Sequence, residues 1–155
     1  MMKQEPTQLH NSEDFHKKMA VDLFNYVWTF LDLESRTSEQ EQTMIHAAHA
    51  SRYHWEQIGK PVNRVRGDWQ ISRVYAVCER SEPSLYHAKK CLEVCLEEQI
   101  GDFDLAFAYE AMARAYKITG SKTQYEEYKK LALQACEDIQ NEKDRDLVLG
   151  DLSSI

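Results

Sequence analysis

The sequence predicts an all-α protein built from antiparallel helical hairpins that stack on one another. Every long segment repeats its apolar residues with the period of a helix, and none alternates like a β-strand. Only three prolines and five glycines occur among 155 residues, a composition that favours continuous helices. Small residues also recur at a fixed spacing, because Ala76 is followed nineteen positions later by Cys95, and Ala113 by Ala132.

The N-terminal segment differs from the rest of the chain. Residues 1–11 are polar and contain Pro6, so we expect a flexible N-terminal arm. Residues 12–155 are expected to form a single helical-repeat domain of three hairpins and a C-terminal capping helix. The length is that of one domain with a continuous core.

The first hairpin is predicted to pair residues 12–33 with residues 38–58. Ser38 and Glu41 have the spacing of a capping box, which would start the second of these helices. Pro61 follows shortly after this helix and is expected to mark its end.

The second hairpin is predicted to pair residues 68–80 with residues 82–99. The preceding stretch, residues 62–67, is ambiguous and is read as a short helical turn before the helix restarts. Ser81 can cap the second helix of this pair, and Pro83 falls in its first turn, where a missing N–H is no loss.

The third hairpin is predicted to pair residues 103–119 with residues 121–140. Asp102 is expected to cap its first helix, and Gly120 to end that helix. Asn141 can cap a short terminal helix. Because the connections between these helices are short, successive helices should pack antiparallel.

The second half of the chain resembles the tetratricopeptide repeat, a helix–turn–helix unit of about 34 residues. One unit matches its slots for large, small and aromatic residues with Tyr109, Met112, Ala113, Tyr116 and Ala132. The preceding unit matches with Tyr75, Ala76, Ala88, Leu92 and Cys95. The resemblance covers residues 69–139 and implies a right-handed solenoid. Residues 66–77 and 101–115 also look like segments of small uncharacterised bacterial proteins, which implies no function.

The chain departs from the repeat pattern at several positions. Tyr125 stands where the family has a small residue, and Glu79 where it has an aromatic one. An earlier unit within residues 13–58 is degenerate, with Trp28 and Ala47 in its two small-residue slots. An unrelated helical bundle is the alternative, because alanine and tyrosine at helical spacing are common in any helical core.

Charge and hydropathy exclude several classes of protein. The formal charge of −7 argues against nucleic-acid binding, which needs a basic surface. No apolar run approaches the length of a membrane span, and the first residues lack the apolar core of a signal peptide. We therefore expect a cytoplasmic protein, in which the four cysteines are free thiols.

The resemblance implies a binding site, because the first helix of each tetratricopeptide hairpin faces a concave groove. The implied groove residues are Asn25, Arg73, Arg80, Phe107, Glu110, Arg114 and Lys117. Four of them are basic, so we expect these four to share one concave face, with Glu110 among them and Asn25 opposite. A ligand with carboxylates would suit such a groove, because arginine pairs with carboxylates in bidentate fashion.

Two other clusters could carry chemistry. His46 and His49 lie one helical turn apart and could be two metal ligands, but a metal site needs a third ligand, so we expect them to form hydrogen bonds between helices instead. A basic cluster precedes and enters the third helix. Its members are Lys60, Arg64, Arg66 and Arg73. It could bind an acidic group, or it could be balanced by acidic neighbours.

These observations favour a non-enzymatic scaffold that binds a peptide or protein segment, acidic in character, without a cofactor, nucleic acid or membrane. One alternative is a metal-binding protein or metal-dependent enzyme that uses His46 and His49. Another is a self-associating protein such as a homodimer, because a short solenoid must cover its apolar ends.

Overall fold

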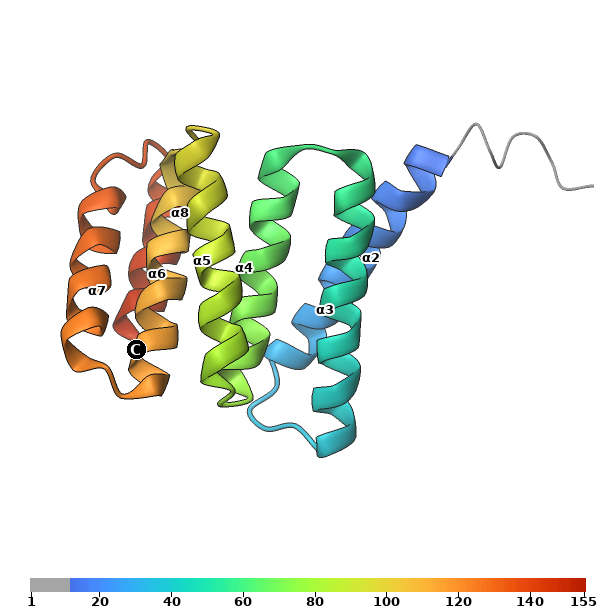
Figure 1. Ribbon diagram of the computed structural model, residues 1–155, viewed down its shortest axis with the longest axis horizontal. Helices are drawn as coiled ribbons and strands as arrows, with labels where there is room; N and C mark the ends of the chain where they lie inside the picture. The colour runs from blue at the N-terminus through green and yellow to red at the C-terminus, as the bar shows by residue number, and fades with distance from the viewer. Residues whose placement is uncertain (1–11) are drawn as a thin grey trace, which may run out of the picture.

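The computed structural model describes residues 12–155, and the predicted N-terminal arm lies outside this range. Within it the chain forms seven α-helices and no strand (Figure 1), which confirms the all-α prediction. The helices are α2 (Ser12–Leu31), α3 (Ser38–Ile58), α4 (Pro61–Val77), α5 (Ser81–Glu97), α6 (Asp102–Thr119), α7 (Lys122–Cys136) and α8 (Glu142–Ser153).

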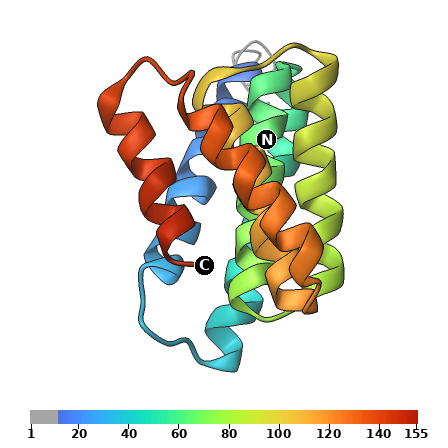
Figure 2. The same cartoon turned by 90° about the vertical axis from the view of Figure 1, so that its left-hand side faces the viewer.

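The helices form three antiparallel hairpins, α2–α3, α4–α5 and α6–α7, as the sequence predicts, and α8 follows the last of them. An inner layer consists of α2, α4, α6 and α8, each of which contacts the next. The outer layer consists of α3, α5 and α7, whose backbones do not approach one another closely, although the His49 ring of α3 lies 5.4 Å from the His87 ring of α5. The stack therefore curves with the inner layer on its concave side. Figure 2 shows α2 and α8 on one side of the stack and α5 on the other.

The predicted start of α4 is wrong, because the helix begins at Pro61 and includes the stretch that was read as a separate turn. Pro61 is the first helical residue, a position where its fixed φ suits the helix and its missing N–H costs nothing. Gly59, in the left-handed region at φ +83°, ends α3. Gly67 lies inside α4 at a point where α3 is close, because a Cβ at this position would lie 2.7 Å from Arg52 Cδ.

Three predicted caps are also wrong. Ser81 is the first residue of α5 rather than its cap, which is Arg80. The capping box of α3 lies one residue earlier than predicted, because Thr37 is still extended and its Oγ1 accepts from the Gln40 N–H at 3.1 Å. The Gln40 side chain accepts from the Thr37 N–H in return, at 2.9 Å. Asp102 is the first residue of α6 rather than its cap, which is Gly101. The predicted cap of α8 is confirmed, because Asn141 Oδ1 accepts from the Asp144 N–H at 3.0 Å.

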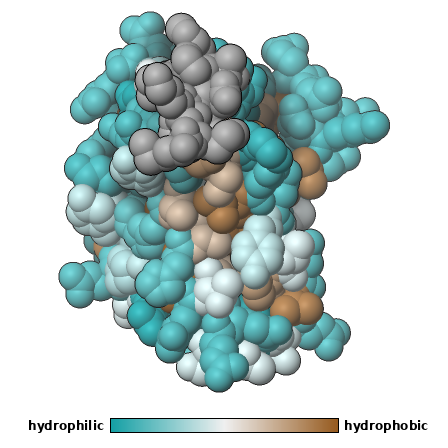
Figure 3. Space-filling model, turned by 90° about the vertical axis from the view of Figure 1, so that its right-hand side faces the viewer, coloured by the Kyte–Doolittle hydropathy of each residue, from teal (hydrophilic) through white to brown (hydrophobic). Residues whose placement is uncertain are grey.

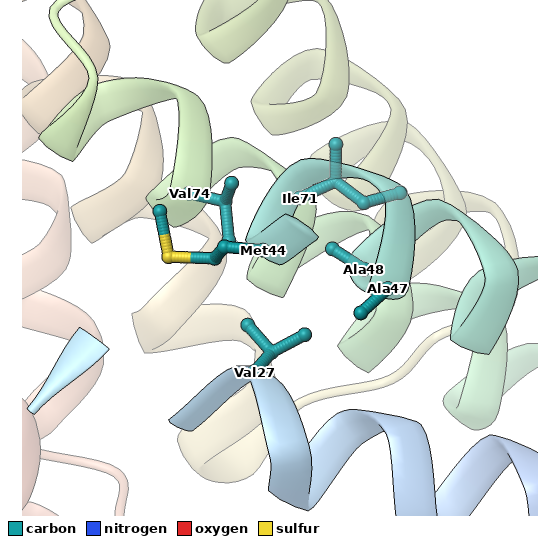
Figure 4. Close-up of a cluster of buried hydrophobic side chains, with 6 residues drawn as sticks. All are labelled: Val27, Met44, Ala47, Ala48, Ile71 and Val74. Atoms are coloured by element: carbon teal, nitrogen blue, oxygen red, sulfur yellow. The ribbon is translucent and has the colours of Figure 1, made fainter. Parts of the chain in front are cut away.

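The core runs through the stack as a series of clusters between neighbouring hairpins. One cluster joins α2, α3 and α4 (Figure 4). Its buried members are Val27, Met44, Ala47, Ala48, Ile71 and Val74. Another joins α6, α7 and α8. Its buried members are Ala106, Ala132, Cys136, Ile139, Val148 and Leu152. The small residues that the repeat pattern singles out, among them Ala88, Ala113 and Ala132, are buried.

The two ends of the stack differ. At one end α8 covers the apolar surface of the last hairpin. At the other end, formed by α2 and α3, a band of apolar residues reaches the surface (Figure 3). Exposed large apolar side chains of these two helices are Phe15, Val21, Tyr26 and Tyr53. None of the helices α2–α8 is both long and apolar enough to cross a membrane.

The first prediction concerns the close approach of α6 to its neighbours. Replacing Ala113, which is fully buried, by leucine should lower the free energy of unfolding by about 1–3 kcal/mol, because the extra methyl groups overpack the helix contacts. Urea unfolding of the variant and parent measures this, with the exposed Thr123→Leu as control. Equal midpoints for Ala113→Leu and the parent would contradict the close packing described here.

Candidate functional site on the concave face

A network of charged side chains lies in the middle of the concave face. Its members, from α4, α6 and α8, are Arg73, Glu110, Arg114 and Asp151, and we call them the arginine–carboxylate network. Arg73 Nη2 lies 2.6 Å from Asp151 Oδ2 and 3.4 Å from Glu110 Oε1. Arg114 donates from Nε to the same Glu110 oxygen at 2.8 Å, and its Nη2 lies 2.7 Å from it. The Glu110 carboxylate thus joins α4 to α6, and the Asp151 carboxylate joins α8 to α4.

The burial of this network determines its energetics. The Glu110 side chain is fully buried, and those of Arg73 and Arg114 are only 13% and 16% exposed. Removing a carboxylate from water is costly unless cations and hydrogen bonds compensate, and the two guanidinium groups provide both. Glu110 Oε2 and Arg73 Nε are buried without a hydrogen-bond partner among residues 12–155. The network therefore buries one acceptor and one donor that have no partner among these residues.

The structure brings together only part of the predicted groove. Arg73, Glu110 and Arg114 meet as expected on the inner layer. Arg80 does not belong to α4, contrary to the predicted helix 68–80, because α4 ends at Val77 and Arg80 is the exposed N-cap of α5. Lys117 is exposed, with its Nζ 5.4 Å from the centre of the Tyr125 ring.

The remaining groove residues have different surroundings. Asn25 is exposed on α2. Phe107 lines an apolar pocket on the same face as the network. The sequence did not indicate Asp151, because no local pattern distinguishes it from the other acidic residues of α8.

An aromatic pocket of about 130 Å³ opens beside the network, towards the N-terminal ends of α4 and α6. Its lining comes from α2, α4, α5 and α6. The lining residues are Phe24, Val65, Arg66, Trp69, Cys91, Phe103, Asp104 and Phe107. The Trp69 ring is 5.2 Å from that of Phe107 and 5.9 Å from that of Trp28, measured between ring centroids. The Trp69 indole N–H is buried without a hydrogen-bond partner among residues 12–155.

Two arginines border the aromatic pocket, and both are paired. Arg66 binds both oxygens of Asp104, at 3.0 and 3.1 Å, and lies over the Phe103 ring. The hydrogen bonds with Asp104 raise the pKa of Arg66 above its usual value, so this pair is ionic. Arg73 lies over the Trp69 ring, 5.2 Å from its centroid, and belongs to the network. The pocket is therefore an apolar cavity between two neutralised charge pairs.

The predicted basic cluster is largely balanced by acidic partners. Arg66 and Arg73 are paired as described, and Arg64 Nε lies 3.7 Å from Glu56 Oε2. Lys60 is the N-cap residue of α4. The cluster does not form a separate cationic site on α4.

The histidines lie between α3, α4 and α5, away from the aromatic pocket. His46 and His49 are both exposed. His49 Nε2 lies 2.8 Å from the Tyr75 hydroxyl, which is the expected hydrogen bond between helices, whereas His46 makes no such bond among residues 12–155. The His49 ring is 5.4 Å from that of His87, whose Nδ1 lies 2.9 Å from Asp68 Oδ1. No three His, Cys, Asp or Glu side chains between positions 12 and 155 converge as metal ligands.

A second histidine pair joins α2 to α3, because the Nδ1 atoms of His16 and His54 are 2.8 Å apart. One ring must donate and the other accept, which requires at least one neutral imidazole. Burial, followed by the charge of His16, lowers the pKa of His54. Burial, followed by the charge of His87, likewise lowers the pKa of His49.

Comparison with known proteins adds no assignment: no family model matches the chain, and neither the curated proteins nor the solved structures contain a significant match.

The second prediction concerns the buried carboxylate. Replacing Glu110 by glutamine should lower the free energy of unfolding by about 3 kcal/mol, because two shielded guanidinium groups lose the charge between them. The control is Glu126→Gln, which removes an exposed partner of Lys122 and should cost no more than about 1 kcal/mol. Similar unfolding midpoints for the two variants would show that burial does not strengthen this network.

The third prediction concerns pH. The lowered pKa values of His49 and His54 mean that the unfolded chain, with an ordinary histidine pKa near 6.5, takes up these protons first as the pH falls. The free energy of unfolding should therefore decrease between about pH 7 and pH 5.5. Denaturant unfolding of His49→Gln and His54→Gln should show a shallower decrease than the parent. If the free energy of unfolding of both variants fell with pH as steeply as that of the parent, His49 and His54 would not be the groups responsible.

Proposed function

We propose that this chain is a non-enzymatic binding module of the tetratricopeptide-like kind, which recognises a peptide or protein segment on the concave face of its inner layer. The observation that supports this most directly is the aromatic pocket. It lies where α2, α4 and α6 converge, and its lining contains aromatic and aliphatic side chains and a closed Arg66–Asp104 pair. Such a lining suits an apolar group better than it suits acid–base chemistry.

The size of the aromatic pocket suits one side chain. A dry, apolar cavity of about 150 Å³ can accommodate a benzene molecule, and this pocket has about 130 Å³. A phenylalanine, leucine or methionine of a bound segment can therefore enter it. Aromatic residues in shielded pockets supply much of the energy of protein interfaces.

We infer that the indole N–H of Trp69, which is buried without a hydrogen-bond partner among residues 12–155, becomes accessible when a ligand enters the pocket and then orients that ligand. A buried donor without an acceptor is energetically unfavourable, and a hydrogen bond removes that penalty. The backbone carbonyl of a bound segment supplies such an acceptor next to its apolar side chain. An apolar anchor and a backbone hydrogen bond together describe recognition of a peptide.

The charge expected of the ligand changes with this geometry. Arg73 and Arg114, two of the cations that suggested an acidic ligand, are already paired with Glu110 and Asp151. The proposed recognition at the aromatic pocket therefore depends first on the apolar anchor.

The fourth prediction tests this function with peptides selected from a random phage-displayed library on the parent protein. The selected peptides should share one large apolar residue. Cys91→Met, which fills the pocket from α5, should weaken their binding at least about tenfold in calorimetric titration. The matched control is Leu96→Met on the same helix, where the side chain is 57% exposed, and its affinity should equal that of the parent.

The titration has a second arm in case Cys91→Met perturbs the core. Trp69→Phe keeps a ring in the pocket and removes the indole N–H, so it should weaken binding about threefold to tenfold. Peptides that bind the parent, Cys91→Met and Trp69→Phe equally well would exclude this pocket as their site. A library that yields no binder would also count against the proposal.

A further inference from the structure

We propose that α8 is a displaceable intramolecular ligand of the concave face, and that an acidic amphipathic helix of a partner protein can take its place. The region concerned, which we call the α8 seat, consists of the buried surface under α8 and the two arginines of the network. It is distinct from the aromatic pocket, to which α8 contributes no lining residue. The inference therefore goes beyond the proposed function, and each can fail without the other.

The α8 seat recognises α8 by an apolar and an acidic feature. Val148 and Leu152, four residues apart, are buried against α6 and α7. Asp151 lies beside them and places Oδ2 2.6 Å from Arg73 Nη2. The backbone oxygen of Asp151 and the hydroxyl of Ser154 lie 3.4 Å from Arg114 Nη2. A helix that fits the seat thus carries two apolar residues at i and i+4 and a carboxylate at i+3.

The charge balance explains why the occupant must be acidic. With Asp151 in place, two arginines face two carboxylates. When α8 leaves, Arg73 and Arg114 face Glu110 alone, so one positive charge lies uncompensated in a largely shielded site. A helix without a carboxylate at the position of Asp151 would bury that charge unpaired, which disfavours it relative to an acidic one.

Several features of α8 indicate that it is held weakly. It has only 12 residues, and a helix of this length is marginal on its own in water. Gly150 lies within it, although a Cβ there would meet no atom within 4 Å, so packing does not require glycine. Glycine weakens a helix interior relative to alanine. Leu147 and Leu149 are 62% and 38% exposed, so two of its large apolar side chains add little to its attachment.

The acidic ligand suggested by the basic groove positions therefore has a counterpart within the chain. Asp151 supplies the carboxylate that Arg73 and Arg114 would bind in a partner. Because α8 and a partner helix compete for one seat, partner affinity must depend on how well α8 is held. Substitutions within α8 should then change the affinity for a partner helix without altering the residues of the α8 seat.

The fifth prediction uses a fluorescein-labelled synthetic peptide with the sequence of residues 140–155 as the probe, titrated with the full-length chain by fluorescence polarisation. Asp151→Asn weakens the chain's own α8 and should bind the peptide about tenfold more tightly than the parent. Gly150→Ala strengthens α8 and should bind it about fivefold more weakly. The matched control is Asp146→Asn, an equal change of charge at an exposed position of α8 that should leave the affinity unchanged.

Amide hydrogen exchange provides a second readout if the peptide binds too weakly to compare. The amides of α8 should exchange faster than those of α6 in the parent, and Gly150→Ala should slow them about fivefold. Equal exchange in α6 and α8, or equal peptide affinity for the parent, Asp151→Asn and Gly150→Ala, would overturn the inference.

Two further measurements distinguish the displacement of α8 from binding at the aromatic pocket and from self-association. Adding Cys91→Met to the Asp151→Asn variant fills the aromatic pocket and should leave the affinity for the α8 peptide unchanged. A failure of the proposed function at the pocket is therefore distinguishable from a failure at the α8 seat. Light scattering should show a monomer at all protein concentrations. A concentration-dependent dimer that Gly150→Ala abolishes would identify a second copy as the occupant and would overturn the assignment to a partner protein.

Discussion

The buried carboxylate of Glu110 is the interaction on which the concave face depends. One of its oxygens is shared by Arg73 from the preceding inner helix and by Arg114 one turn further along α6. Arg73 in turn binds Asp151 of α8. A charge in a fully buried position is tolerated only when its partners are fixed, so Glu110 imposes a register on α4, α6 and α8. The positions of the aromatic pocket and of the α8 seat follow from that register.

Small side chains provide the second constraint. Ala88, Ala113 and Ala132 are fully buried, and they let helices of neighbouring hairpins approach closely. The backbones of the inner helices approach one another more closely than those of the outer helices, so the stack curves. Phe24 of α2, Trp69 of α4 and Phe107 of α6 thereby line one aromatic pocket. The pocket is thus a consequence of packing between hairpins and not of any one hairpin.

The charge of the protein is organised differently on its inner and outer surfaces. The chain carries a formal charge of −7, yet basic residues collect at the inner positions of α4 and α6. Their charge is neutralised inside the molecule by Asp104, Glu110 and Asp151. An arginine that is neutralised by a carboxylate on another helix differs from one that is surrounded by solvent, because a carboxylate of another protein can replace the internal one. This distinction links the basic pattern in the sequence to the proposed role of α8.

Local signals in the sequence determined the helices and the hairpins, because helical period, caps and breakers act over a few residues. The resemblance to the tetratricopeptide repeat implied inward-facing positions for Arg73, Glu110 and Arg114. Local signals had limits. They misplaced the start of α4 and the capping box of α3, because proline can begin a helix as well as end one and Thr37 competes with Ser38 as cap. Only the tertiary structure decided that Asp151 pairs with Arg73, 78 residues away, and that Trp69 lines a pocket together with residues of three other helices. Contacts of that kind depend on how the hairpins stack, and the periodicity of a single helix carries no information about them.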